Sequence, residues 1–146
     1  MGIEGEDTAA ILDGVDFLRD VNLGMKVDIG DKVTVVGGGN VAIDASRTAL
    51  RLGAKEVTIT YRRSRAEMPA GAEEVNEALS EGVKLVYLVT PVRVISLDGK
   101  LKVEFIRMEL GEVDESGRRR PIPVKGSEFV GEYDTIIKAI GASQSS

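Results

Sequence analysis

A glycine-rich turn between a β-branched run and an alanine-rich segment constrains the fold of this chain more than any other feature. Residues 33–36 (Val-Thr-Val-Val) predict a buried strand, and residues 37–42 (Gly-Gly-Gly-Asn-Val-Ala) fit the pattern G-x-G-x-x-A at the start of a helix. In this pattern the first glycine makes a tight turn, the second lets the backbone approach a pyrophosphate, and the small last residue permits close helix–strand contact. The residues assigned to this candidate phosphate loop are Gly37, Gly38, Gly39, Asn40, Val41 and Ala42.

Two alternatives accompany this assignment. Doubly wound folds also use glycine at strand-to-helix turns that hold no ligand. Asn40 also has an explanation within the fold, because asparagine is a good helix cap and can serve there without touching a ligand.

The pattern of strands and helices continues after the loop. A helix to about residue 52 buries Ala42, Ala45, Ala49 and Leu52, and is followed by a strand at 57–61, a helix between residues 69 and 82, and a strand at 83–90. Residues 91–97 and 101–110 then predict an antiparallel hairpin with a bulge near 105–106, and the prolines beside Ile122 restrict 122–124 to a sheet edge. A last strand follows at 134–140.

These elements predict an α/β fold, a Rossmann-like NAD(P)-binding domain with a central parallel sheet and an antiparallel β-meander insertion. We place the domain at residues 32–141, with a polar tail at 142–146. Residues 1–31 read as a connector with an amphipathic helix that Thr8 caps and that Asn22-Leu23-Gly24 ends.

Arginines follow the second strand of this unit. NAD-specific sites place an acidic residue there for the ribose 2′-hydroxyl, whereas here Tyr61 leads into Arg62, Arg63 and Arg65. Guanidinium groups bind a 2′-phosphate well, which favours NADPH over NADH and argues against an S-adenosylmethionine site, which also needs an acid there. The alternative is a solvated basic loop, and we assign that role to 118–120.

Composition excludes several kinds of chemistry. The chain has no His and no Cys, so a Ser-His triad, a disulfide framework, a thiolate nucleophile and an Fe–S site are excluded within it, and any redox step needs a cofactor. Nineteen Lys and Arg against 24 Asp and Glu give a net charge of −5, which argues against nucleic acid or an anionic membrane as partner. The acidic start at 1–7 is unlike a signal peptide, and we expect a cytoplasmic protein.

Several motifs together resemble one family. The chain is similar, from about residue 14 to residue 141, to the NADPH-binding domain of the glutamate synthase small (beta) subunit and its relatives, including the matching part of dihydropyrimidine dehydrogenase. The motifs that carry the resemblance are Val35–Asp44, Arg47–Leu50, Tyr61–Arg63 and Glu67–Ala70.

The resemblance implies an NADPH-dependent FAD and Fe–S oxidoreductase of the kind that supports glutamate biosynthesis. In it an FAD domain is split in sequence around the NADPH domain, and electrons leave through Fe–S clusters on a cysteine-rich domain or a partner subunit. This chain has no second G-x-G-x-x-G and no Cys, so we expect a domain of a longer flavoenzyme. Its expected partners are the FAD-binding domain of that parent and a large catalytic subunit. The alternative is a stand-alone NADP(H)-sensing module without catalysis.

Two further places belong to the predicted site. Relatives carry an acid near the nicotinamide at the position of Asp44, which would orient the carboxamide or pair with a base from another domain. The alternative is an ion pair between Asp44 and Arg47 along the helix. Ala139, Ile140 and Gly141 end the last strand and should line the nicotinamide side, because ligands lie beyond the carboxyl ends of parallel strands.

Overall fold

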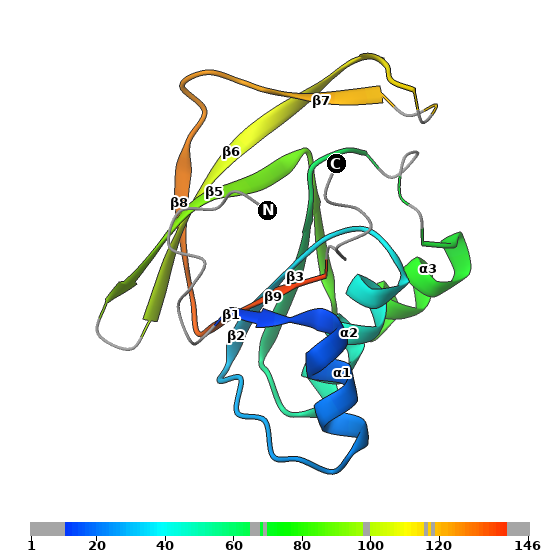
Figure 1. Cartoon of the computed structure of the whole chain (residues 1–146), viewed down its shortest axis with the longest axis vertical. Helices are drawn as coiled ribbons and strands as arrows, with labels where there is room; N and C mark the ends of the chain where they lie inside the picture. The colour runs from blue at the N-terminus through cyan, green and yellow to red at the C-terminus, as the bar shows by residue number, and fades with distance from the viewer. Residues whose placement is uncertain are drawn as a thin grey trace.

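The structure is a computed structural model, and it describes residues 11–64, 68, 70–97, 100–115, 117 and 119–139. Two sheets lie against each other, with three helices on the outer face of one of them (Figure 1). The first sheet is parallel and has the order β1 (Ile11–Asp13), β9 (Thr135–Lys138), β2 (Lys32–Val36), β3 (Glu56–Tyr61) and β4 (Lys84–Tyr87). The predicted fold class is confirmed.

Alternation along the parallel strands gives the sheet two buried faces. Val33 and Val35 of β2 join Ile137 of β9 in a core beneath the helices, whereas Val36 and Ile136 belong to a second core beneath the antiparallel sheet. Strands buried on both faces are expected to be rich in β-branched residues throughout, as β2 is.

The helices α1 (Gly14–Asn22), α2 (Asn40–Arg51) and α3 (Ala72–Ser80) cover the first core. Ala42, Ala45 and Ala49 of α2 are fully buried, as the small-residue pattern predicts, but Leu52 is 42% exposed, because the chain has already left the helix there. Among the described residues, no helix is long and apolar enough to cross a membrane.

The amino-terminal segment is part of the layered unit. The sequence suggested a connector up to residue 31, whereas β1 pairs in parallel with β9 and α1 packs on the same core as α2. Ile11 and Leu12 therefore lie in a strand rather than in the helix. Asp13 caps α1, accepting hydrogen bonds from the backbone N–H of Val15 (2.9 Å) and Asp16 (3.1 Å); Thr8, the predicted cap, lies outside the described residues.

The antiparallel sheet covers the other face. Its strands are β5 (Val89–Leu97), β6 (Lys100–Val113), β7 (Arg119–Pro123) and β8 (Phe129–Tyr133). β6 is the long central strand: β5 pairs along one side of it, while β8 and β7 pair with its first and second halves.

Three details differ from the sequence analysis. The bulge is on the opposite strand, since Pro91 pairs with Phe105 and Arg93 with Glu104, which leaves Val92 as the extra residue. The strand β8 was not predicted. Residues 119 and 120, assigned to a solvated turn, begin β7, which pairs with β6 alone and is the edge strand that its prolines require.

Candidate nucleotide site

The glycine loop is held between the ends of β3 and β9. The backbone N–H of Gly37 donates to the Thr60 carbonyl (3.1 Å), and that of Ala139 donates to the Val36 carbonyl (2.9 Å). Gly37 has φ +140°, and a Cβ there would lie 3.1 Å from the Ala139 oxygen. The first glycine of the motif is therefore required by the turn itself, in agreement with its predicted role.

Gly38 occupies the variable position of the pattern and Gly39 its second required glycine, and the two have different neighbours. A Cβ on Gly38 would lie 2.6 Å from Cε1 of Tyr61, whose ring is buried beneath the loop, whereas a Cβ on Gly39 would meet no described atom within 4 Å. The Gly38 carbonyl also accepts a hydrogen bond from Ala70 (3.1 Å), which brings the chain just before α3 against the loop. No described residue therefore fills the space beside Gly39, which we call the open side of Gly39.

The helix α2 begins without a side-chain cap. Its N-cap is Gly39, with φ −95° and ψ −173°, no side chain among the described residues accepts from its first amides, and its first turn carries no acid. Asn40 is the first helical residue and does not act as the cap, contrary to the alternative considered above. The first intrahelical bond runs from Ile43 to the Gly39 carbonyl (3.2 Å), so the amides of residues 40–42 have no acceptor within the helix.

The arginines after β3 differ in how far the structure describes their surroundings. Arg62 is half-buried beside Tyr61. Arg63 is buried, with its side chain 7% exposed: Nη2 lies 3.2 Å from Oδ2 of Asp114 and Nε donates to the Arg119 carbonyl (2.9 Å). Arg65 lies outside the described residues. The guanidinium of Arg63 is therefore directed toward the antiparallel sheet.

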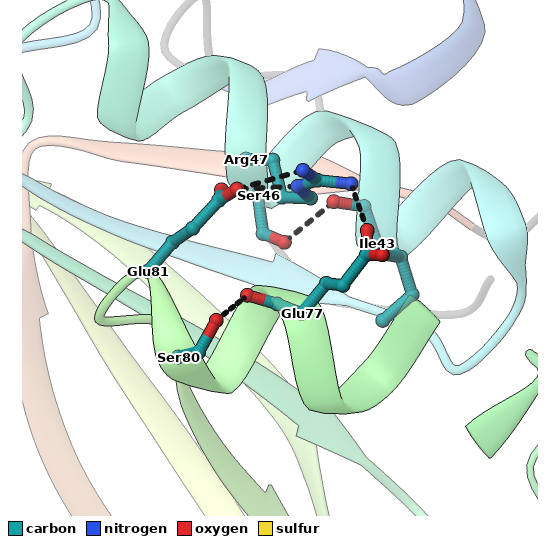
Figure 2. Close-up of polar contacts among 6 residues, drawn as sticks. All are labelled: Ile43, Ser46, Arg47, Glu77, Ser80 and Glu81. Atoms are coloured by element: carbon teal, nitrogen blue, oxygen red, sulfur yellow. Dashed lines mark hydrogen bonds and ion pairs between the residues drawn. The ribbon is translucent and has the colours of Figure 1, made fainter. Parts of the chain in front are cut away.

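Asp44 lies exposed on the first turns of α2 and forms no ion pair with Arg47. Figure 2 shows Arg47 reaching across to α3, where it binds both carboxylate oxygens of Glu81 (3.0 and 2.7 Å) and one of Glu77 (3.2 Å). Hydrogen bonding to Glu81 raises the pKa of Arg47, and the charge of Asp44 adds only a lesser contribution. The helical ion pair considered above is not formed, and a role for Asp44 beside the nicotinamide stays a prediction.

The structure brings together the glycine loop, the start of α2, Arg62 and Ala139 at the carboxyl edge of the parallel sheet. Ile140 and Gly141 lie outside the described residues. Backbone amides at a helix start and an arginine that follows the neighbouring strand are groups suited to bind a phosphorylated ligand.

Sequence reasoning missed three residues around this site. Tyr61 was predicted as the end of a strand and as part of a family motif, but not as the residue beneath the loop. The additional glycine at the variable position of the motif, Gly38, is the signal that a bulky side chain lies there. Ala70 and Asp114 carry no such signal, because their contacts with Gly38 and Arg63 join segments far apart in the sequence.

Comparisons with known proteins identify relatives of this chain. The chain is 54% identical over 146 residues to NADPH-Fe(3+) oxidoreductase subunit beta of Geobacter sulfurreducens, covering 97% of this chain and 22% of that protein. It is 41% identical over 150 residues to the glutamate synthase [NADPH] small chain of Halomonas elongata, covering 96% and 32%. The resemblance inferred from the motifs is confirmed, and the chain spans a third or less of these relatives' length.

A solved structure shares the fold. Mycobacterium tuberculosis FprA in complex with NADPH superposes with a TM-score of 0.81 at 17% identity, covering 97% of this chain and 47% of that one. The family model described as pyridine nucleotide-disulphide oxidoreductase matches residues 1–146. This chain therefore belongs to the pyridine nucleotide-disulphide oxidoreductase family.

Proposed function

We propose that this chain is the NADPH-docking domain of a longer flavoprotein oxidoreductase. The pyrophosphate would lie against the amides of residues 40–42, the 2′-phosphate against Arg62, and the nicotinamide beside Ala139, with Ile140, Gly141 and Asp44 near it. When bound, the dinucleotide supplies a hydride to a flavin in another domain and is left as NADP⁺. Iron–sulfur clusters and a large subunit would take the electrons onward.

The observation that carries this proposal is the open side of Gly39 next to an uncapped helix start. No described neighbour requires glycine at Gly39, and other residues can adopt its backbone angles, so the packing of the described residues does not explain why glycine stands there. Close approach of a pyrophosphate to the backbone explains it. Both curated relatives carry NADPH in their names, which supports the phosphorylated nucleotide.

Arg62 is the residue on which the nucleotide preference rests in this proposal. The chain should bind NADPH more tightly than NADH, and Arg62→Ala should remove most of the difference, because a charge-assisted contact to phosphate contributes about 1.5–3 kcal/mol, or roughly tenfold or more in affinity. Titration calorimetry with both nucleotides measures this.

Arg51→Ala is the matched control, because Arg51 is exposed at the opposite end of α2. The control should leave both affinities unchanged. Equal affinity of the unmodified chain for NADPH and NADH would contradict the assignment of Arg62, and absence of binding by either nucleotide would contradict the proposed function as a whole.

A further inference from the structure

A partly buried ion pair joins the loop after β3 to the distal part of the antiparallel sheet. Arg63 and Asp114 have side chains that are 7% and 24% exposed, and the same guanidinium also donates to the Arg119 carbonyl. We call residues 108–115 and 119–123, where β6 and β7 pair, the β6–β7 arm. Arg63 thus connects the candidate 2′-phosphate loop to this arm.

The backbone of Arg63 is held by the same region. Its carbonyl accepts from Leu88 (3.1 Å), and the Leu88 carbonyl accepts from Met108 at the base of the arm (2.7 Å). Leu88 has φ +59°, a left-handed conformation that a leucine adopts only when its surroundings impose it. The backbone and the side chain of Arg63 are therefore both held in place. Arg63 lies between Arg62 and Ser64 in the sequence, so the loop is fixed at the residue next to Arg62.

This arrangement conflicts with a direct role of Arg63 in binding phosphate. To reach a ligand, Arg63 would have to leave Asp114, and removing one partner from a largely buried pair leaves the other charge uncompensated. If Arg63 kept its position, a phosphate that bound to it would lie close to the Asp114 carboxylate, which is 3.2 Å from the guanidinium. The two negative charges would then repel each other.

We propose that Arg63 is a positioning residue, and that the Arg63–Asp114 pair fixes the loop so that Arg62, rather than Arg63, presents its guanidinium to the 2′-phosphate of NADPH. The proposal rests on the proposed function of the chain. Its physical basis is preorganisation: a loop that is already ordered loses less conformational entropy on binding than one that must be ordered by the ligand. Asp114, which lies 51 positions after Arg63, then becomes a determinant of nucleotide preference.

A double-mutant cycle tests this proposal in the 146-residue chain, with NADPH and NADH titrated into Arg63→Ala, Asp114→Ala and the double variant. Each variant should bind NADPH roughly threefold to tenfold more weakly, the range expected when one or two side chains must be ordered on binding. The double variant should lose no more than Arg63→Ala alone, because that variant already lacks the contact with Asp114. NADH affinity should change by less than about twofold, since Arg62 has no phosphate to meet.

Two controls separate positioning from general damage. Glu115→Ala removes the neighbouring exposed carboxylate of the same arm and should change neither affinity. In an Arg62→Ala background, Asp114→Ala should not alter the NADPH-to-NADH ratio. Amide exchange of Leu88, which donates to the Arg63 carbonyl, should rise about threefold or more in Asp114→Ala without nucleotide, reporting the loosened loop independently of binding.

The outcomes are distinct. If Asp114→Ala leaves or tightens NADPH binding while Arg63→Ala weakens it, Arg63 contacts the phosphate and the proposal is wrong. Equal losses for NADPH and NADH would also overturn it, because they indicate a purely structural pair. Failure of the proposed function appears instead in the unmodified chain, as absence of binding by either nucleotide.

Discussion

Neighbouring glycines in the phosphate loop are required for different reasons. At Gly38 the reason is internal, because the Tyr61 ring occupies the place of a side chain, and Tyr61 is itself buried at the end of β3. At Gly39 the described neighbours leave the place open. A motif that looks uniform in sequence therefore combines a packing requirement with a proposed ligand requirement.

Alanine substitutions should separate the two. Gly38→Ala should lower the free energy of unfolding by about 1–3 kcal/mol, the usual cost of an added methyl group in a packed site. Gly39→Ala should change it by less than about 1 kcal/mol but weaken NADPH binding about tenfold or more, since the new methyl would hinder the amide–phosphate contacts. Denaturant unfolding and calorimetry measure the two effects. Similar unfolding free energies for the two variants would contradict the packing argument at Gly38.

At the scale of elements, α2 and α3 are joined by Arg47. Both carboxylate oxygens of Glu81 accept from this guanidinium, and Glu77 adds a third contact one turn earlier (Figure 2). The hydrogen bond from Arg47 lowers the pKa of Glu81. A pair between Arg47 and Asp44 along the same helix was one alternative considered from the sequence, but Glu81 at the end of α3 offers a carboxylate in bidentate geometry, which is the stronger interaction.

The pH dependence of Glu81→Gln should report this contact. A carboxyl whose pKa is lower in the folded state stabilises the fold above its unfolded pKa, and that contribution disappears as the pH falls through the folded value. The variant should therefore melt at a lower temperature than the unmodified chain at pH 7, with a gap that closes in acid. Glu109→Gln, an exposed carboxylate on β6, is the control and should show no such gap. A gap that persists unchanged in acid would argue against the ion pair.

At the scale of the whole molecule, Asp134 joins the two sheets. It lies between β8 and β9, and its Oδ2 accepts from the backbone N–H of Asp31 (3.0 Å) and Lys32 (2.9 Å) at the start of β2. Its other oxygen pairs with Lys100 at the start of β6. The Lys100 ammonium, and after it the two backbone N–H groups, lower the pKa of Asp134.

Asp134→Ala should destabilise the fold by about 2 kcal/mol or more, because two backbone donors lose a charged acceptor. Lys100→Ala should cost less, since it removes the ammonium and leaves both backbone bonds in place. By the same linkage as for Glu81, the stabilisation from Asp134 is present at neutral pH and lost as the pH falls below about 4. Denaturant unfolding at several pH values measures this, and a larger loss for Lys100→Ala than for Asp134→Ala would contradict it.

Much of the fold was predictable because its signals are local. The strand at 33–36, the helix after it and the strand at 57–61 follow from residue periodicity and from the glycine loop, and the structure places them within a residue or two. Errors arose where the pattern was ambiguous. Ile11 and Leu12 fit helical spacing, yet they pair with β9 in a strand, and the bulge expected near residues 105–106 is an extra residue, Val92, on β5.

In the candidate site, too, some features follow from the local sequence and others only from long-range packing. Sequence alone determined the glycine loop, the helix behind it and the arginines at the end of the second strand, because these depend on backbone geometry and on neighbours a few residues away. Only the tertiary structure decided that Gly38 rests on Tyr61 and that Arg63 binds Asp114 rather than extending beside Arg62. The physical reason is that a buried guanidinium takes its partner from whichever segment packs against it, and that segment is chosen by the packing of the two sheets and not by distance along the chain.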